Sequence, residues 1–143
     1  MGTQSITVVF EDHERKNVLC TIYRQFDGYL SGHGQELKDI LSGKKIINGI
    51  SGETTKDSYN GMGCLSAHLI KMLKGDSIGG IYLYLKQDSF DYVDYVYEIY
   101  PSEQKFIDET KSYPKQYNKI MLKVDDYNGE IDNLDTTEKE EEE

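Results

Sequence analysis

Two short glycine-bearing segments have the composition of an anion-binding loop, and each stands directly before a predicted helix. The first is residues 31–34 (SGHG), before a predicted helix at 35–41, and the second is residues 60–63 (NGMG), before a predicted helix at 64–73. A helix N-terminus presents unpaired N–H groups and the positive end of its dipole, and glycine lets an anion approach the backbone. Two such openings facing one cleft would suit a ligand with several phosphates. The alternative is that these residues only make turns and cap helices.

Arg24 and His33 are the side chains near these segments that could do chemistry. Arg24 ends a predicted strand, where it would either clamp a phosphate with two hydrogen bonds or form an ion pair with Asp27 or another carboxylate. His33 stands between two glycines, so we expect a functional role rather than a packing role. It would donate a hydrogen bond to a phosphate or, in an enzyme, act as a general acid or base. Tyr23 and Tyr29 would stack on a base.

The sequence thus predicts one ligand-binding site. If the protein is an enzyme, the catalytic candidates are His33 with Ser31 or Tyr29 with Arg24, and His33 is the first choice. The candidate ligand-binding residues are Tyr23, Arg24, Asp27, Tyr29, Ser31, Gly32, His33, Gly34, Asn60, Gly61, Met62 and Gly63. There is no G-x-S-x-G motif, no paired-carboxylate site and no His or Cys spacing typical of a metal site. We therefore expect no metal and no cofactor. His68 falls on the apolar stripe of the second helix, where a hydrogen-bonded histidine in the core or at the edge of a cleft is expected rather than a ligand.

The elements that must position these residues follow from hydrophobic periodicity. Alternating patterns predict strands at 5–10, 18–26, 44–50, 81–85, 92–100, 105–109 and 120–124, with the first two forming an antiparallel hairpin. Residues 51–59 are expected to form a polar loop. Two helices among many strands predict an α+β fold, with a mostly antiparallel sheet and both helices packed on one face as a second layer.

Charge divides the chain into two parts. The 143 residues carry a net charge of −10, but residues 125–143 alone hold ten acidic residues and one lysine. Such a run repels itself and buries little apolar surface. We therefore predict a single domain at 1–124 and a disordered acidic tail at 125–143. The nearly neutral domain has no basic stripe for nucleic acid and no apolar run long enough to span a membrane. Cys20 and Cys64 are expected to be buried, reduced thiols, as in a cytoplasmic protein.

Three segments carry a family resemblance. They are residues 23–34 (YRQFDGYLSGHG), 61–67 (GMGCLSA) and 79–84 (GGIYLY), within a stretch from about residue 18 to residue 100. This stretch resembles a family of small uncharacterised proteins of bacteriophages, archaeal viruses and prophage-bearing bacteria. The resemblance implies a phage-type accessory protein that acts in the host cytoplasm against host defence.

Three functions remain open from the sequence. The first is a non-enzymatic protein that binds a small phosphorylated or nucleotide-like ligand, sequesters a host immune signal and works as an oligomer. The second is a protein-interaction inhibitor of a host defence protein, which would use the acidic tail or an exposed sheet edge. The third is a small enzyme that cleaves phosphodiester or glycosidic bonds with His33.

Overall fold

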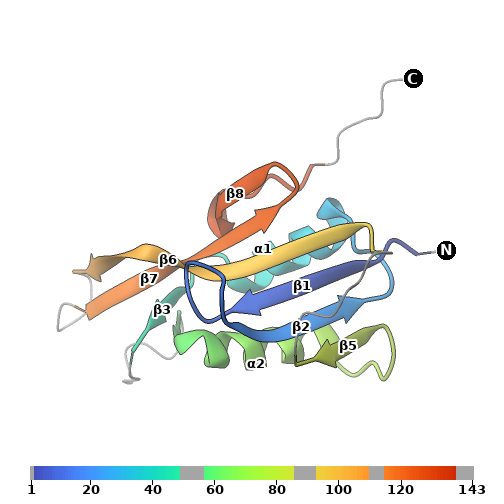
Figure 1. Ribbon diagram of the computed structural model, residues 1–143, viewed down its shortest axis with the longest axis horizontal. Helices are drawn as coiled ribbons and strands as arrows, with labels where there is room; N and C mark the ends of the chain where they lie inside the picture. Colours follow the sequence, from blue (N-terminus) through green and yellow to red (C-terminus); the bar gives the residue numbers. More distant parts are fainter. Residues whose placement is uncertain (1, 49–56, 86–92, 110–114, 138–143) are drawn as a thin grey trace.

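The computed structural model describes residues 2–48, 57–85, 93–109 and 115–137 (Figure 1). In chain order the elements are β1 (Ser5–Phe10), β2 (Val18–Arg24), the π-helical turn η1 (Leu30–Gly34), α1 (Gln35–Leu41), β3 (Lys45–Ile47), β4 (Ser58–Asn60), α2 (Gly61–Lys74), β5 (Ile81–Tyr84), β6 (Tyr95–Asp108), β7 (Lys115–Val124), β8 (Tyr127–Glu130) and the 3₁₀ turn η2 (Ile131–Asn133). Helices and strands share one body, so the predicted α+β class is confirmed. Within the predicted strands, loop and tail, residues 49–56, 92 and 138–143 lie outside the described residues.

The strands form one sheet in the order β4-β3-β7-β6-β1-β2-β5, with β8 also paired to β7. The β1–β2 hairpin is antiparallel, as predicted, and the β2–β5, β3–β7, β6–β7 and β7–β8 pairs are antiparallel too. The β1–β6 and β3–β4 pairs are parallel. Among the described strands, β4 and β5 therefore end the sheet, and β5 has a strand neighbour only on the β2 side.

The sheet carries buried side chains on both faces. The larger cluster joins both helices to the sheet, through residues such as Leu37 of α1 and Leu69 of α2 against Val9 and Ile22. The smaller cluster lies on the opposite face and holds Ile6, Val8, Phe10 and Tyr100. Strand β1 is buried throughout because its alternate residues enter the two clusters. This placement fixes β1 and β2 as the rigid base on which the first glycine segment is held.

Two strand predictions differ from the structure in instructive ways. Ser58–Asn60 forms β4, a short parallel neighbour of β3, although a polar loop was predicted there. The separate strands expected at 92–100 and 105–109 form one long strand, β6, whose pairing with β7 shifts between Pro101 and Lys105. Proline removes a ladder donor, so a strand that contains one needs such an irregularity. Here Ser102 Oγ fills the gap by accepting from the Lys119 backbone N–H at 2.9 Å.

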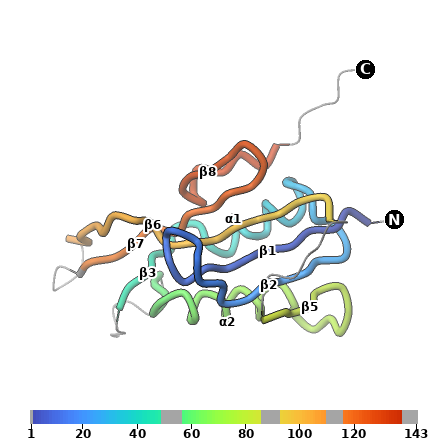
Figure 2. Tube along the Cα trace, in the orientation of Figure 1, coloured from blue at the N-terminus to red at the C-terminus, as the bar shows by residue number. Residues whose placement is uncertain are grey.

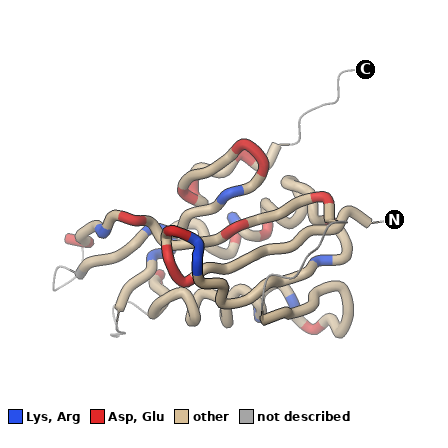
Figure 3. The backbone as a smooth tube through the Cα atoms, viewed as in Figure 1, with Lys and Arg blue, Asp and Glu red and all other residues tan. Residues whose placement is uncertain are grey.

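The chain remains folded beyond the predicted domain boundary at 124. Tyr127–Glu130 pairs with β7 as β8, and Ile131 and Leu134 are 2% and 1% exposed within the larger core cluster. Figure 2 shows the chain turning back over β7 before its C-terminus, and Figure 3 shows acidic positions along this segment. The acidic count hid Ile131 and Leu134, which supply the burial, and Tyr127, which packs against the same cluster. The described domain therefore extends to Thr137, and a disordered tail is not observed over 125–137.

Candidate functional site

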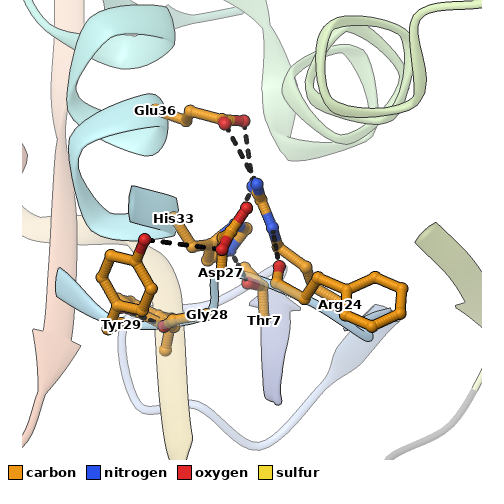
Figure 4. A network of polar contacts seen from close by, with 9 residues as sticks. Thr7, Arg24, Asp27, Gly28, Tyr29, His33 and Glu36 are labelled. Carbon is orange, nitrogen blue, oxygen red and sulfur yellow. Dashed lines mark hydrogen bonds and ion pairs between the residues drawn. The ribbon is translucent and has the colours of Figure 1, made fainter. Parts of the chain in front are cut away.

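His33 is at the centre of the first predicted site, and it is fully buried rather than facing a cleft. Its exposed fraction is 0%, and its ring packs edge-on against Tyr97 with the centroids 4.9 Å apart. Its Nε2 lies 2.6 Å from Thr7 Oγ1 on β1, and its Nδ1 lies 3.2 Å from Arg24 Nη1 on β2 (Figure 4). His33 is therefore packed in the core, although the flanking glycines predicted a functional role rather than a packing role.

Burial and the neighbouring guanidinium lower the pKa of His33 to about 3. The imidazole is consequently neutral at physiological pH. A general acid or base at this position would need a pKa near the working pH and contact with a substrate. The buried position gives His33 neither, so its catalytic role is not supported by the geometry.

Of the two roles predicted for Arg24, the structure shows the ion pair with a carboxylate and not the phosphate clamp. Its Nη1 and Nη2 donate to the two carboxylate oxygens of Glu36 at 2.9 and 3.1 Å, and its Nε donates to the Phe26 carbonyl at 2.6 Å. The Arg24 side chain is 14% exposed, whereas Glu36 is 47% exposed. The prediction named Asp27 or another carboxylate as the partner, and the acceptor is Glu36, from the first turn of α1 and 12 residues away in the sequence.

Three backbone amides of the first glycine segment donate to carbonyl groups that directly precede the segment. Gly32 N–H donates to the Tyr29 carbonyl at 3.0 Å, His33 N–H to the Asp27 carbonyl at 2.9 Å and Gly34 N–H to the Tyr29 carbonyl at 3.4 Å. The last bond spans five residues, because Leu30–Gly34 winds as a single π-helical turn that runs directly into α1. Helical backbone therefore begins at Leu30, before Gly32 and Gly34. These two glycines do not form an anion-binding loop at the N-terminus of the helix.

Close packing explains why glycine occupies position 32. A Cβ on Gly32 would lie 2.6 Å from the Asp27 carbonyl oxygen. At Gly34 a Cβ would meet only ordinary contacts, with Leu30 at 3.4 Å and the Tyr97 hydroxyl at 3.5 Å. The two glycines that flank His33 therefore differ in how strictly the structure requires them.

The other candidates of the first segment surround this network without completing a binding site. Asp27 is exposed, has a φ of +60° and accepts a hydrogen bond from the Tyr29 hydroxyl at 3.4 Å. Ser31 is exposed on the turn. Tyr23 packs with the smaller cluster on the opposite face of the sheet, and its ring lies 5.9 Å from that of Tyr82. Tyr23 and Tyr29 therefore do not flank one ligand.

The second segment is a true helix start. Gly61 has a φ of +82° and begins α2, the Asn60 side chain does not cap the helix and the first turn has no acidic residue. Asn60 and Gly61 line a hollow of about 570 Å³ with residues of β3, β6 and β7: Ile46, Ile47, Asn48, Lys105, Gln116 and Asn118. Met62 is buried in the core and Gly63 is exposed. The lining of this hollow is mostly polar and includes one basic side chain, that of Lys105.

The two glycine segments do not open onto one cleft. Arg24, Asp27 and Glu36 line a different hollow, shared with residues 76–82 that follow the C-terminal end of α2. The two hollows have no lining residue in common, and α2, with 14 residues, separates its two ends by about 20 Å. The predicted joint site for several phosphates is therefore not formed.

The hollow next to β5 is a feature that the sequence analysis missed. It has a volume of about 750 Å³ and is lined by Arg24, Gln25, Phe26, Asp27, Glu36, Leu73, Asp76, Ser77, Ile78, Gly79, Gly80, Ile81 and Tyr82. Phe26 is 52% exposed and Ile78 is 97% exposed. The sequence feature that could have indicated this surface is the uncharged apolar run at 81–85 (IYLYL). The structure places this run on a strand at the end of the sheet, where part of it is exposed.

Other candidates are structural. His68 is half-buried and its Nδ1 lies 2.6 Å from the Tyr59 hydroxyl, which fits the predicted hydrogen-bonded role, and burial raises the pKa of Tyr59 to about 12. Cys20 is buried, but Cys64 is exposed, contrary to expectation, because it falls on the outer side of the first turn of α2. The described residues contain no cluster of three potential metal ligands.

Comparisons of the chain with protein-family models, with curated proteins and with solved structures found no match. No helix within the described part of the chain has the length and apolarity needed to cross a membrane. The function must therefore be argued from the surface and the packing of this chain.

Proposed function

We propose that this protein is a non-enzymatic interaction module that binds a protein partner along the edge strand β5. The main observation in support of this proposal is that the exposed apolar side chains are concentrated around β5. Of the nine large apolar side chains that are most exposed among the described residues, six lie on β5, directly after it or in the hollow beside it: Phe26, Ile78, Tyr82, Leu83, Tyr84 and Leu85. Exposed apolar patches of this kind mark interaction sites.

An edge strand also supplies a template for main-chain pairing. Proteins recognise extended segments by adding them to a sheet edge, where backbone hydrogen bonds give affinity and side-chain pockets give specificity. Within the described residues, strand β5 has no strand neighbour on its outer side, and it lies next to such a pocket. This matches the second function that the sequence left open, an inhibitor that acts through an exposed sheet edge. With the family resemblance, it supports a phage-type accessory protein whose partner is a host defence protein.

The test is selection of short peptides by the full-length protein, followed by hydrogen exchange on the complexes. We expect selected peptides to bind the parent protein, to lose binding to Leu83→Lys and to protect the backbone amide of Leu83 from exchange. Ile107→Lys is the matched control, because Ile107 is 59% exposed on β6, away from β5. Peptides that bind both variants equally, or that protect another strand, would contradict the proposal.

A second candidate function keeps the nucleotide-like ligand and moves it to the start of α2. The hollow at Asn60 and Gly61 combines a helix N-terminus, Lys105 and several side-chain amides, which together favour an anion with a polar ring. In this second candidate function the protein sequesters a small phosphorylated molecule, and we propose that it does so as an oligomer. We interpret the fold as the predicted two-layer arrangement, in which this hollow lies where helix and sheet meet.

A thermal-shift panel of nucleotides, including cyclic dinucleotides and cyclic ADP-ribose types, tests the second candidate. A sequestering protein melts higher in proportion to the logarithm of the ligand excess, and the ligand is recovered intact by chromatography. Lys105→Glu should abolish the shift, whereas Lys123→Glu on β7 should keep it. An altered ligand would point to an enzyme, and the absence of any shift would remove this candidate for the panel used.

A further inference from the structure

The backbone pattern of β5 defines which of its groups face away from the sheet. The Gln25 N–H donates to the Gly80 carbonyl at 2.9 Å, so these opposed residues form a hydrogen-bonded pair. Pairs alternate along an antiparallel ladder, so the backbone groups of Ile81 and Leu83 point away from β2. The Ile81 carbonyl indeed accepts from a side chain, Lys74 Nζ, at 2.9 Å. An incoming strand would therefore pair mainly with Leu83.

The hollow beside this edge has an acidic excess. Its lining carries three carboxylates, Asp27, Glu36 and Asp76, against the single guanidinium of Arg24. Glu36 already binds Arg24 with two hydrogen bonds. Asp27 and Asp76 are both exposed, and no ion pair compensates either one within the described residues. Lys74 Nζ, at the Ile81 carbonyl, is a second positive charge beside the hollow, so three carboxylates face two cationic groups and the net charge that an arriving segment meets is still negative.

The same hollow has apolar walls. Phe26 and Ile78 are more than half exposed, and Leu73 and Tyr82 complete the apolar part of the lining. Long basic side chains lay their methylene stems along apolar surface and keep their charge at a polar rim. A hollow lined by apolar side chains and by these two carboxylates therefore fits lysine or arginine better than it fits an anion.

Resting on the proposed function, we infer that the partner segment of β5 is an extended strand that places a lysine or arginine side chain in this hollow. The strand pairs with Leu83, and its basic side chain lies over Phe26 and Ile78 with its charge between Asp27 and Asp76. A second copy of this chain fits less well, because it carries a net charge of −10 and brings the same carboxylates. Charge complementarity thus selects a basic partner segment.

The test uses the full-length protein and three nine-residue peptides that share one alternating apolar pattern and differ only at the polar positions, which are Arg, Gln or Glu. Binding is followed by fluorescence anisotropy at low and high salt. We expect the Arg peptide to bind tightest and the Glu peptide not to bind. The double variant Asp27→Asn/Asp76→Asn should weaken the Arg peptide about five-fold, from two exposed ion pairs, and should leave the Gln peptide unchanged. Asparagine tolerates the positive φ of Asp27.

The matched control is Glu103→Gln/Asp126→Asn, which removes the same charge from exposed positions on β6 and in the β7–β8 turn. It should leave the affinity for the Arg peptide unchanged. Equal binding of the Arg and Gln peptides, unaffected by Asp27→Asn/Asp76→Asn, would overturn the basic partner and keep docking at β5. Binding of no peptide would overturn docking at β5 as well. Dimers that compete with the peptides would identify a second copy as the occupant and overturn the inference.

Discussion

Arg24 Nη1 lies 3.2 Å from His33 Nδ1, and this contact fixes the tautomer of the buried imidazole. A guanidinium has only donors, so Nδ1 must accept and the ring proton must be on Nε2. That proton is donated to Thr7 Oγ1 at 2.6 Å. The result is a chain of polar contacts from exposed Glu36 through Arg24 and His33 to buried Thr7, which joins the glycine turn and α1 to the first two strands (Figure 4).

The first prediction concerns the dependence of stability on pH. His33 has a folded pKa of about 3, below its ordinary value of 6.5. Above pH 6.5 the folded and unfolded states are both neutral at this residue, so stability is unaffected. Between pH 6.5 and 3 only the unfolded state binds the proton, so stability falls as pH falls, by at most about 1.4 kcal/mol per pH unit. Urea unfolding of the parent and of His33→Gln at several pH values should show a shallower slope for the variant. Equal slopes would contradict the assignment.

The second prediction concerns Arg24. Because Arg24→Ala leaves Glu36 and the buried Nδ1 of His33 without their donor, we expect a loss of about 1–3 kcal/mol in the free energy of unfolding. Arg24→Lys should recover only part of this, since an ammonium group lacks the planar fork. Glu36→Gln is the control and should cost less than Arg24→Ala, because Glu36 is half exposed. Denaturant titration measures all three. A fully stable Arg24→Ala variant would show that the network does not stabilise the domain.

Most elements could be predicted from the sequence because they follow local periodicity. The helix at 35–41 and the strand at 5–10 have the predicted bounds. The candidate site could not be predicted, because its decisive facts are contacts across the fold. Glu36 reaches Arg24 only after α1 packs on β2, and Thr7 meets His33 across 26 residues. The turn-like composition around His33 resembles an exposed loop, although Tyr97 and β1 enclose it.

The third prediction separates the roles of three glycines. Gly32→Ala should destabilise the domain by about 1–3 kcal/mol, because its Cβ would lie 2.6 Å from a carbonyl oxygen. Gly34→Ala meets ordinary contacts only and should be close to neutral. Gly63→Ala, with no atom near its Cβ inside α2, should stabilise by about 0.5–1 kcal/mol through helix propensity. Thermal melting ranks the variants. The reverse order for Gly32 and Gly63 would contradict the packing explanation.

The fourth prediction concerns the end of the domain. A chain that ends at Thr137 should keep its stability, whereas a chain that ends at Val124 loses β8 and the buried Ile131 and Leu134 and should unfold much more readily. Leu134→Ala alone should cost about 2–4 kcal/mol, as for other buried leucines. Circular dichroism during thermal unfolding distinguishes these chains. Equal stability of the chains that end at 124 and 137 would show that β8 adds nothing to the fold.

The fifth prediction concerns Lys74, which partly protects the edge of β5. Its Nζ donates to the Ile81 carbonyl at 2.9 Å and lies 5.8 Å from the Tyr82 ring centroid. Lysine at a sheet edge opposes pairing with further strands, because an incoming strand must displace the charge. Lys74→Met should free this carbonyl and keep the side-chain length, so both peptide binding at β5 and self-association should increase. Light scattering and peptide anisotropy measure the two effects, with Lys71→Met, one turn earlier on α2, as the control. Unchanged binding in Lys74→Met would mean that an incoming strand pairs through Leu83 without reaching the Ile81 carbonyl.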